Sequence, residues 1–157
     1  MTGIAVHFVD VYPIRFVVGG AETLVLRRSA AVRCTGAWEA VHGHIEAGET
    51  PVTAALRELL EETGLAPTAF YNLSRTEAFY LHRTDEVAMI PAFAAIVDPA
   101  ADVVVSEEHD EARWLSLADA RTELAWPRER RALADIEILL GNGDAGPLED
   151  VLRVRLD

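Results

Sequence analysis

The chain has 157 residues, which is enough for one domain with a single buried core. Its composition is that of an ordinary soluble globular protein, and its formal net charge of −12 argues against a general nucleic-acid binder, which needs a basic face. All 14 basic residues are arginines and none is lysine, so a Walker-type phosphate loop and Schiff-base chemistry are excluded. A phosphate site in this chain has to depend on metal ions, arginines and backbone amides.

Three features of the sequence bear on the compartment. No apolar run approaches the roughly 20 residues that a membrane span requires, so we expect no membrane partner. The first residues lack the basic flank and small-residue cleavage site of a secretory signal. Cys34 is the only cysteine and cannot form an internal disulfide, which fits a reducing compartment. We therefore expect a cytoplasmic protein.

Five stretches of the chain predict β-strands. Residues 4–18 and 23–28 are rich in branched and aromatic side chains and are separated by a glycine-containing turn. Residues 69–81 and 87–97 show the same composition around a short polar turn, and residues 110–115 can add another short strand. The region between the second strand and the first helix predicts a loop with short extended pieces.

Three helices are also predicted. Thr50 followed by Pro51 supplies a capping hydroxyl and a proline at the first helical position, so a helix should run over residues 51–63 and stop at Gly64. A short helix is expected over residues 116–124 and a last one from Pro127, closed by a glycine-rich turn. Strands around one central helix, with helices at the end, indicate an α/β or α+β fold.

The same pattern predicts one domain. It covers residues 1–143, and residues 144–157 are expected to be a C-terminal tail or a short added element.

The first predicted helix has two contrasting faces. At 100° per residue, Glu58, Glu61 and Glu62 fall on one side. The opposite side, expected to face the core, carries Val52, Leu56, Leu59, Leu60 and Thr63. A solvated charged face is the ordinary interpretation of three such glutamates, but like charges at these spacings repel and no lysine offsets them. The preceding loop is also rich in glycine. Clustered carboxylates suit Mg²⁺, which takes a few protein oxygens together with substrate phosphates.

This region resembles the Nudix box, whose pattern is GX5EX7REUXEEXGU with U a bulky aliphatic residue. The matching positions are Gly43, Glu49, Arg57-Glu58-Leu59, Glu61-Glu62 and Gly64-Leu65. All nine defined positions agree in one register, and the order of strands and helices over the whole chain is also similar to a Nudix domain. The resemblance implies a Nudix fold, an α/β/α sandwich around a mixed β-sheet.

The resemblance also implies a metal site. Glu58, Glu61 and Glu62 would bind Mg²⁺, with Mn²⁺ as an alternative, and the backbone carbonyl of His42 would be a further ligand. Many relatives have a proline-glycine-glycine turn where this chain has Val41-His42-Gly43. If the ligand is the carbonyl, the imidazole of His42 need not contact metal and is then an ordinary loop side chain.

Within the box, Glu49 and Arg57 would form a structural ion pair that holds the loop against the helix. Arg28, at the end of the second predicted strand, is expected to contact substrate phosphate, because its forked donors suit that task. A surface arginine is the equally weighted alternative.

A weaker resemblance points to the dihydroneopterin triphosphate pyrophosphohydrolase branch. Glu108-His109, Trp114 and the segment from Trp126 to Arg130 are similar to segments of that branch, as is Trp38 before the box. Glu108 would add a further metal-site carboxylate. Trp38 either stacks on the substrate's ring or packs in the fold, and packing is favoured for Trp114 and Trp126.

These observations predict an enzyme acting on a small phosphorylated molecule. A Mg²⁺-dependent Nudix hydrolase would cleave a nucleoside or pterin triphosphate to a monophosphate and pyrophosphate, with Glu61, Glu58 or Glu108 accepting the proton. The alternatives are a dinucleoside polyphosphate or ADP-ribose-type pyrophosphatase, a non-catalytic ligand sensor, and a prenyl diphosphate isomerase. Nudix proteins often dimerise, so a homodimer is an open alternative to a monomer.

Overall fold

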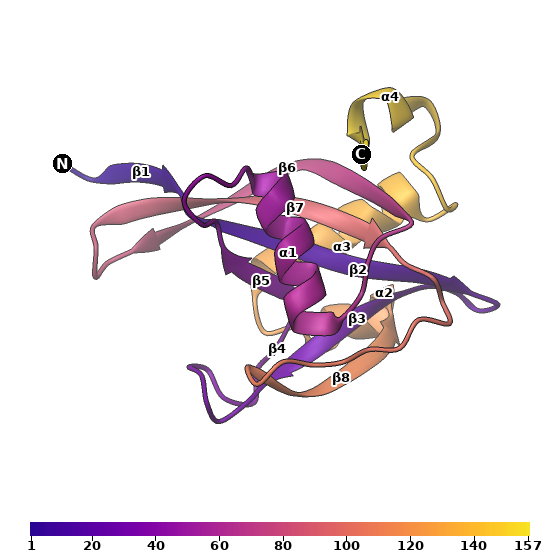
Figure 1. Ribbon diagram of the computed structural model, residues 1–157, viewed down its shortest axis with the longest axis horizontal. Helices are drawn as coiled ribbons and strands as arrows, with labels where there is room; N and C mark the ends of the chain where they lie inside the picture. The colour runs from indigo at the N-terminus through magenta and orange to yellow at the C-terminus, as the bar shows by residue number, and fades with distance from the viewer.

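One mixed β-sheet runs through the molecule, and helices cover both of its faces (Figure 1). The computed structural model describes residues 1–157. Its strands are β1 (Gly3–Val6), β2 (Phe8–Val17), β3 (Gly20–Arg28), β4 (Trp38–Glu39), β5 (Val41–His44), β6 (Ala69–Leu81), β7 (Glu86–Ile96), β8 (His109–Ser116) and β9 (Arg153–Val154). The central order is β4-β3-β2-β7-β6-β9, and β1, β5 and β8 pair with β7, β2 and β3 respectively. β7 is parallel to β1 and β2, and the other pairs are antiparallel.

Each face of the sheet has its own apolar core. Helix α1 (Pro51–Thr63) crosses one face and encloses a cluster that includes Leu26, Leu59 and Phe70. Helices α2 (Leu117–Glu123) and α3 (Pro127–Leu140) cover the other face, behind the sheet in Figure 1, and enclose a second cluster around Leu133. The predicted α+β sandwich with a mixed sheet is confirmed. No helix of the structure is long and apolar enough to span a membrane.

The ends of α1 follow the predicted signals. The Thr50 side chain accepts a hydrogen bond from the backbone N–H of Thr53, and the Thr53 side chain accepts one from the N–H of Thr50. Gly64 ends the helix with a φ of 71°, a left-handed conformation that glycine adopts without strain.

The predicted core face of α1 is correct except at one position. Its other members are buried or pack against the core: Val52, Leu56, Leu59 and Thr63. Leu60 was expected inside, but 58% of its surface is exposed, whereas Glu58 and Glu62 are buried. Ala54 is also buried, and small side chains let the helix approach β5 closely, which turns two carboxylates inward. A pattern based on hydrophobicity alone does not reveal these two buried carboxylates.

The end of the chain is folded against the sheet. A 3₁₀ turn (Gly146–Leu148) and α4 (Glu149–Leu152) lead into β9, which pairs antiparallel with β6 at Phe70 and Tyr71. Leu152 is buried in the core beneath α3. Of the two expectations for this segment, the structure has the short added element.

Candidate active site

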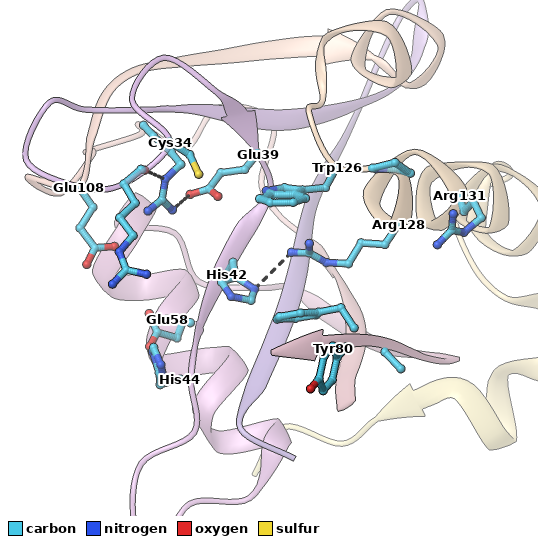
Figure 2. A pocket seen from close by; sticks show the side chains of 16 residues that line it. Cys34, Glu39, His42, His44, Glu58, Tyr80, Glu108, Trp126, Arg128 and Arg131 are labelled. Atoms are coloured by element: carbon cyan, nitrogen blue, oxygen red, sulfur yellow. Dashed lines mark hydrogen bonds and ion pairs between the residues drawn. The ribbon is translucent and has the colours of Figure 1, made fainter. Parts of the chain in front are cut away.

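A cavity of about 760 Å³ opens where β5, β6, the start of α3 and the loops around β4 meet. Its two ends differ in chemistry (Figure 2). Glu39, Glu58 and Glu108 lie at one end, which we call the carboxylate end. Arg28 belongs to this end because it binds Glu39 and the carbonyl of Arg33, another lining residue. The other end, which we call the group end, is lined by Tyr80, Trp126, Arg128 and Arg131. Their chain neighbours Ala78, Phe79 and Pro127 also line the cavity. His42 lies between the two ends.

The first glycine of the box makes room for a carboxylate. A Cβ built on Gly43 would fall on the carboxylate of Glu58, well inside van der Waals contact. β5 and α1 can therefore hold Glu58 at the cavity only because residue 43 has no side chain. This close approach gives the glycine a steric role, in agreement with the glycine-rich loop seen in the sequence.

Glu62 lies deeper on the same face of α1. It is 3% exposed, and its Oε2 atom has no hydrogen-bond partner. Burial raises the pKa of Glu62 well above its ordinary value, and the neighbouring charges of Glu58, Glu39 and Glu108 raise it further. Burial likewise raises the pKa of Glu58. Several carboxylates thus converge with too little positive charge among them.

These residues fit a divalent cation. Carboxylate oxygens are hard ligands, and the partnerless Oε2 of Glu62 is an acceptor that a cation would satisfy. No three His, Cys, Asp or Glu side chains already stand together as a complete cation site. One reason is that a Glu58 oxygen is bonded to Arg57, 2.8 Å away. Ligand side chains would have to turn toward an incoming cation.

Glu61 and Glu108 lie at different distances from this centre. Glu108 is exposed and lines the carboxylate end, opposite α1. Glu61 is also exposed but is not among the lining residues, and its carboxylate binds Arg57 at 3.1 Å. Glu58 and Glu108 therefore line the carboxylate end, Glu62 is buried one helical turn from Glu58, and Glu61 lies outside the lining.

Arg57 connects the loop to the helix. Its Nε and Nη2 atoms donate to the two oxygens of Glu49 at 2.7 and 2.9 Å, and Nη2 also donates to the carbonyl of His44. Hydrogen bonds from Arg57 and from the Glu46 N–H lower the pKa of Glu49 to about 2. Because Nη1 of Arg57 also binds Glu58, one guanidinium fixes both the loop and a candidate ligand.

A second buried pair supports Arg28. Its Nη1 donates to Glu39 at 2.8 Å, and the same Glu39 oxygen lies 2.9 Å from Nε2 of the buried His109. Arg28 lines the carboxylate end, as expected for a phosphate contact. The sequence pattern gave no signal that Glu39, which follows Trp38 in the two-residue strand β4, is buried.

Of the two roles expected for Trp38, the structure shows packing in the fold. Trp38 is not among the residues lining the cavity. Its ring packs against the core under α2 and α3, with the Arg113 guanidinium 4.7 Å from the ring centroid. Trp126, for which packing was favoured, is 41% exposed and stands at the group end.

Arg128 is held in the group end by a buried aspartate. Its Nε and Nη2 atoms donate to the two oxygens of Asp10 at 2.8 and 3.3 Å, and Nδ1 of His42 lies 2.7 Å from Asp10. Burial lowers the pKa of Arg128, but Asp10 raises it more, so the guanidinium stays charged. Sequence analysis missed Asp10, which is separated from Arg128 by most of the chain. The His42 imidazole is engaged here rather than free for a cation.

The fold is a sandwich, and its loop-helix motif places a carboxylate at one end of a cavity. Together these two features define the class of this protein. The family model of the NUDIX domain matches residues 9–136. The chain therefore belongs to the Nudix domain family, and the predicted Nudix hydrolase is confirmed at the level of the family.

Curated relatives extend this result. The asymmetrical bis(5'-nucleosyl)-tetraphosphatase of Mus musculus is 32% identical over 113 residues, which are 71% of this chain and 74% of the relative. An octanoyltransferase of Myxococcus xanthus is 36% identical over 107 residues, or 67% of this chain. The match spans only 30% of that protein's length.

Solved structures agree on the fold. A C. elegans Ap4A hydrolase in a binary complex has a TM-score of 0.73 and 22% identity, and the alignment covers 88% of this chain and 99% of that one. The E. coli dihydroneopterin triphosphate pyrophosphohydrolase has a TM-score of 0.65 and 23% identity, with coverage of 83% and 94%. Both branches share the fold, so the fold does not select the branch expected from the sequence.

Proposed function

We propose that this chain is a divalent-cation-dependent hydrolase that cleaves a phosphoanhydride bond of a nucleoside or pterin triphosphate, releasing a monophosphate and pyrophosphate. The observation that carries the proposal is the placement of Glu58 against Gly43, beside the buried and partnerless Glu62, at one end of a cavity whose other end is aromatic. Such a cavity suits a molecule with phosphates at one end and a flat ring at the other.

The carboxylate end would hold the cation. Glu58, Glu62 and Glu108, with Glu61 turning in and the carbonyl of His42, supply the oxygen ligands that Mg²⁺ or Mn²⁺ prefers. A bound cation would neutralise phosphate charge and make water a better nucleophile toward phosphorus. This assignment explains why an acidic protein without lysine can accept an acidic substrate.

The protein's own groups have separate tasks. Arg28, fixed by Glu39, offers its guanidinium to the phosphates. Glu61, Glu58 or Glu108 accepts the proton of the attacking water, and Arg57 keeps Glu58 in place before the substrate arrives.

A dinucleoside polyphosphate is the second candidate substrate. It is favoured by the similarity to the mouse asymmetrical tetraphosphatase. Cleavage of a dinucleoside tetraphosphate at an unsymmetrical bond would give a monophosphate and a triphosphate, so the products distinguish the two substrates.

Product analysis with a glutamate variant tests the proposal. The protein and Mg²⁺ would be incubated with nucleoside triphosphates, dihydroneopterin triphosphate and diadenosine tetraphosphate, and products would be separated by ion exchange. We expect Glu61→Gln to reduce turnover by about 10²-fold or more while the fold survives, because it removes a cation ligand or the base. Glu123→Gln, an exposed change on α2, is the control. Equal turnover by Glu61→Gln and the parent protein would contradict the assigned site.

A further inference from the structure

The group end of the cavity offers hydrogen-bond donors to a ring. Its charged side chains are Arg128 and Arg131, and all three carboxylates that line the cavity lie at the other end (Figure 2). Both oxygens of the buried Asp10 are already bonded to Arg128. No carboxylate among the lining residues of this end is therefore available to accept a hydrogen bond from a ligand's amino group.

The same end is shaped for a flat ring. Phe79 stacks on Phe8 at 5.9 Å, and Phe8 stacks on His42 at 5.1 Å, so one aromatic row supports this wall. Trp126 stands on the α3 side with its indole exposed to the cavity, and the Arg128 guanidinium lies 5.4 Å from its ring centroid. Aromatic walls bind many heterocycles by stacking, so selectivity has to come from the polar groups at the edge of the ring.

Arg128 is such a polar group, and its orientation is fixed. Asp10 engages Nε and Nη2, and Nη2 also lies 3.5 Å from Nδ1 of His42, whereas Nη1 has no hydrogen bond to the protein. Asp10 is fully buried and cannot move aside without losing both its partners, Arg128 and His42. Because Arg128 lines the cavity, the N–H groups on the Nη1 side of its guanidinium remain for a ligand.

The edges of common heterocycles differ in their match to such donors. A 6-oxopurine presents the O6 and N7 acceptors side by side, and arginine pairs with both. A 6-aminopurine replaces O6 with an amino donor, which would face the guanidinium and leave donors unpaired. The 4-oxo ring of a pterin also offers a carbonyl oxygen next to a ring nitrogen.

We infer that the group end selects an oxo-heterocycle over an amino-heterocycle, with Arg128 as the residue that determines this specificity and Asp10 as the residue that positions it. The inference rests on the proposed function and narrows it: among triphosphates, those of a 6-oxopurine or a 4-oxopterin are the preferred substrates, and adenosine triphosphate is disfavoured.

Inosine and adenosine triphosphates provide the sharpest comparison, because their rings differ only at position 6 and in the proton at N1. We expect kcat/KM for ITP to exceed that for ATP by about tenfold or more, as a bidentate arginine contact discriminates between bases. GTP should resemble ITP, and 7-deaza-GTP should lose part of the advantage. The kcat/KM value for dihydroneopterin triphosphate tests the preference for a 4-oxopterin separately. Equal kcat/KM values for ITP and ATP would overturn the inference.

Variants of Arg128 distinguish the contribution of its forked guanidinium from that of its positive charge. Arg128→Met should bring the ITP/ATP ratio close to one, mainly by lowering kcat/KM for ITP. Arg128→Lys keeps the charge but not the fork, and it should retain only a small part of the ratio. Arg121→Met removes an arginine of α2 that pairs with Glu137 away from the cavity, and it should leave the ratio unchanged. A parental ratio that survives in Arg128→Met would contradict the role of this residue.

A binding measurement keeps this inference apart from the proposed function. Calorimetric titration with ITP and ATP in Ca²⁺ compares the two rings without requiring turnover. Absence of hydrolysis together with tighter binding of ITP would contradict the proposed function and support the selectivity of the group end. Hydrolysis of both substrates with equal affinities would support the proposed function and contradict the selectivity of the group end. Asp10→Asn should weaken the preference in the same titration, and an unchanged preference would remove Asp10 from the mechanism of selection.

Discussion

The two ends of the cavity are built in different ways. At the carboxylate end, β5 and helix α1 supply Gly43, Glu58 and Glu62 from one continuous stretch of sequence, which residues of β3, β4 and the loop before β8 complete. At the group end, Asp10 comes from β2, Phe79 from β6 and Arg128 from α3. The first end is therefore centred on a local motif, whereas the second exists only when the sheet is assembled.

This difference assigns catalysis to the carboxylate end and substrate selectivity to the group end. The carboxylate end keeps acidic groups close together by means of a local steric fit and one shared guanidinium. The group end keeps one donor group aimed by a buried ion pair between distant segments. Changes in the first should therefore reduce turnover on every substrate, and changes in the second should alter the preference among substrates.

The largest effect is expected from Gly43→Ala. The new Cβ would meet the Glu58 carboxylate, and the flexible glutamate would be displaced more readily than the backbone. We expect kcat to fall by about 10²-fold, since small misplacements of catalytic groups have effects of that order. The melting temperature should change little, and the loss should be similar for ITP and ATP. Gly19→Ala is a matched control, because a Cβ there meets nothing within 4 Å.

A parental kcat in Gly43→Ala would mean that Glu58 does not act from its observed position. A loss confined to one nucleotide would instead show that the two ends are coupled.

A smaller effect is expected from Arg57→Lys. Lysine keeps the charge but cannot bind both oxygens of Glu49 while contacting the His44 carbonyl and Glu58. We expect kcat/KM to fall by about 10- to 100-fold, the usual range for groups that orient ligands. The apparent affinity for Mg²⁺ should fall with it, measured as the Mg²⁺ dependence of the initial rate. Arg121→Lys serves as the control, and an unchanged Mg²⁺ dependence in Arg57→Lys would contradict an orienting role.

The contrast also explains what could be predicted from the sequence. The mixed α+β sandwich, the bounds of α1 and its Gly64 stop follow from local signals, and the structure confirms them. The buried face of α1 was predicted wrongly at Leu60, which is exposed, and the burial of Ala54 and of two glutamates was not predicted. Hydrophobicity ranks side chains by transfer free energy, whereas close approach between a helix and a strand favours small ones.

The group end could not be predicted for a topological reason. Asp10 looks like an isolated acid inside an apolar strand, and nothing local connects it to Arg128. In the sequence Trp38 was the ring-stacking candidate and packing was favoured for Trp126, but Trp38 packs in the core and Trp126 lines the cavity. Pairing between distant segments carries no periodic signal in one sequence.

The smallest predicted effect concerns the charge of Glu129, which lies next to Arg128 in α3. It is fully buried at the start of α3, where one oxygen accepts a hydrogen bond from the N–H of Ala40 and the other has no partner. Burial above all, then Asp10 and more weakly Glu39, raise the pKa of Glu129, while Arg128 and the Ala40 N–H lower it, and the net result is about 8. The carboxyl group is therefore mostly protonated in the folded protein at neutral pH, when an unfolded chain would ionise it.

The sign of the pH dependence follows from these two states. Below the ordinary pKa of a glutamate, both states bind the proton and Glu129 contributes no penalty. As the pH rises toward about 8, only the unfolded state releases the proton, so stability falls by at most about 1.4 kcal/mol per pH unit from this group. Glu129→Gln removes this slope and keeps an acceptor for Ala40. Glu62, whose pKa is also raised, contributes equally to both proteins and cancels in the difference.

Urea unfolding of the parent and of Glu129→Gln at several pH values between about 5 and 9 measures that difference. We expect the variant to gain stability relative to the parent as the pH rises and the gain to level off above the pKa of Glu129. Glu123→Gln, an exposed change, should show a constant difference. Parallel curves for the parent and Glu129→Gln would mean that Glu129 is already ionised and stabilised by Arg128. In that case Asp10 would share the guanidinium, and the ITP preference of Arg128 should be weaker than the geometry of the group end implies.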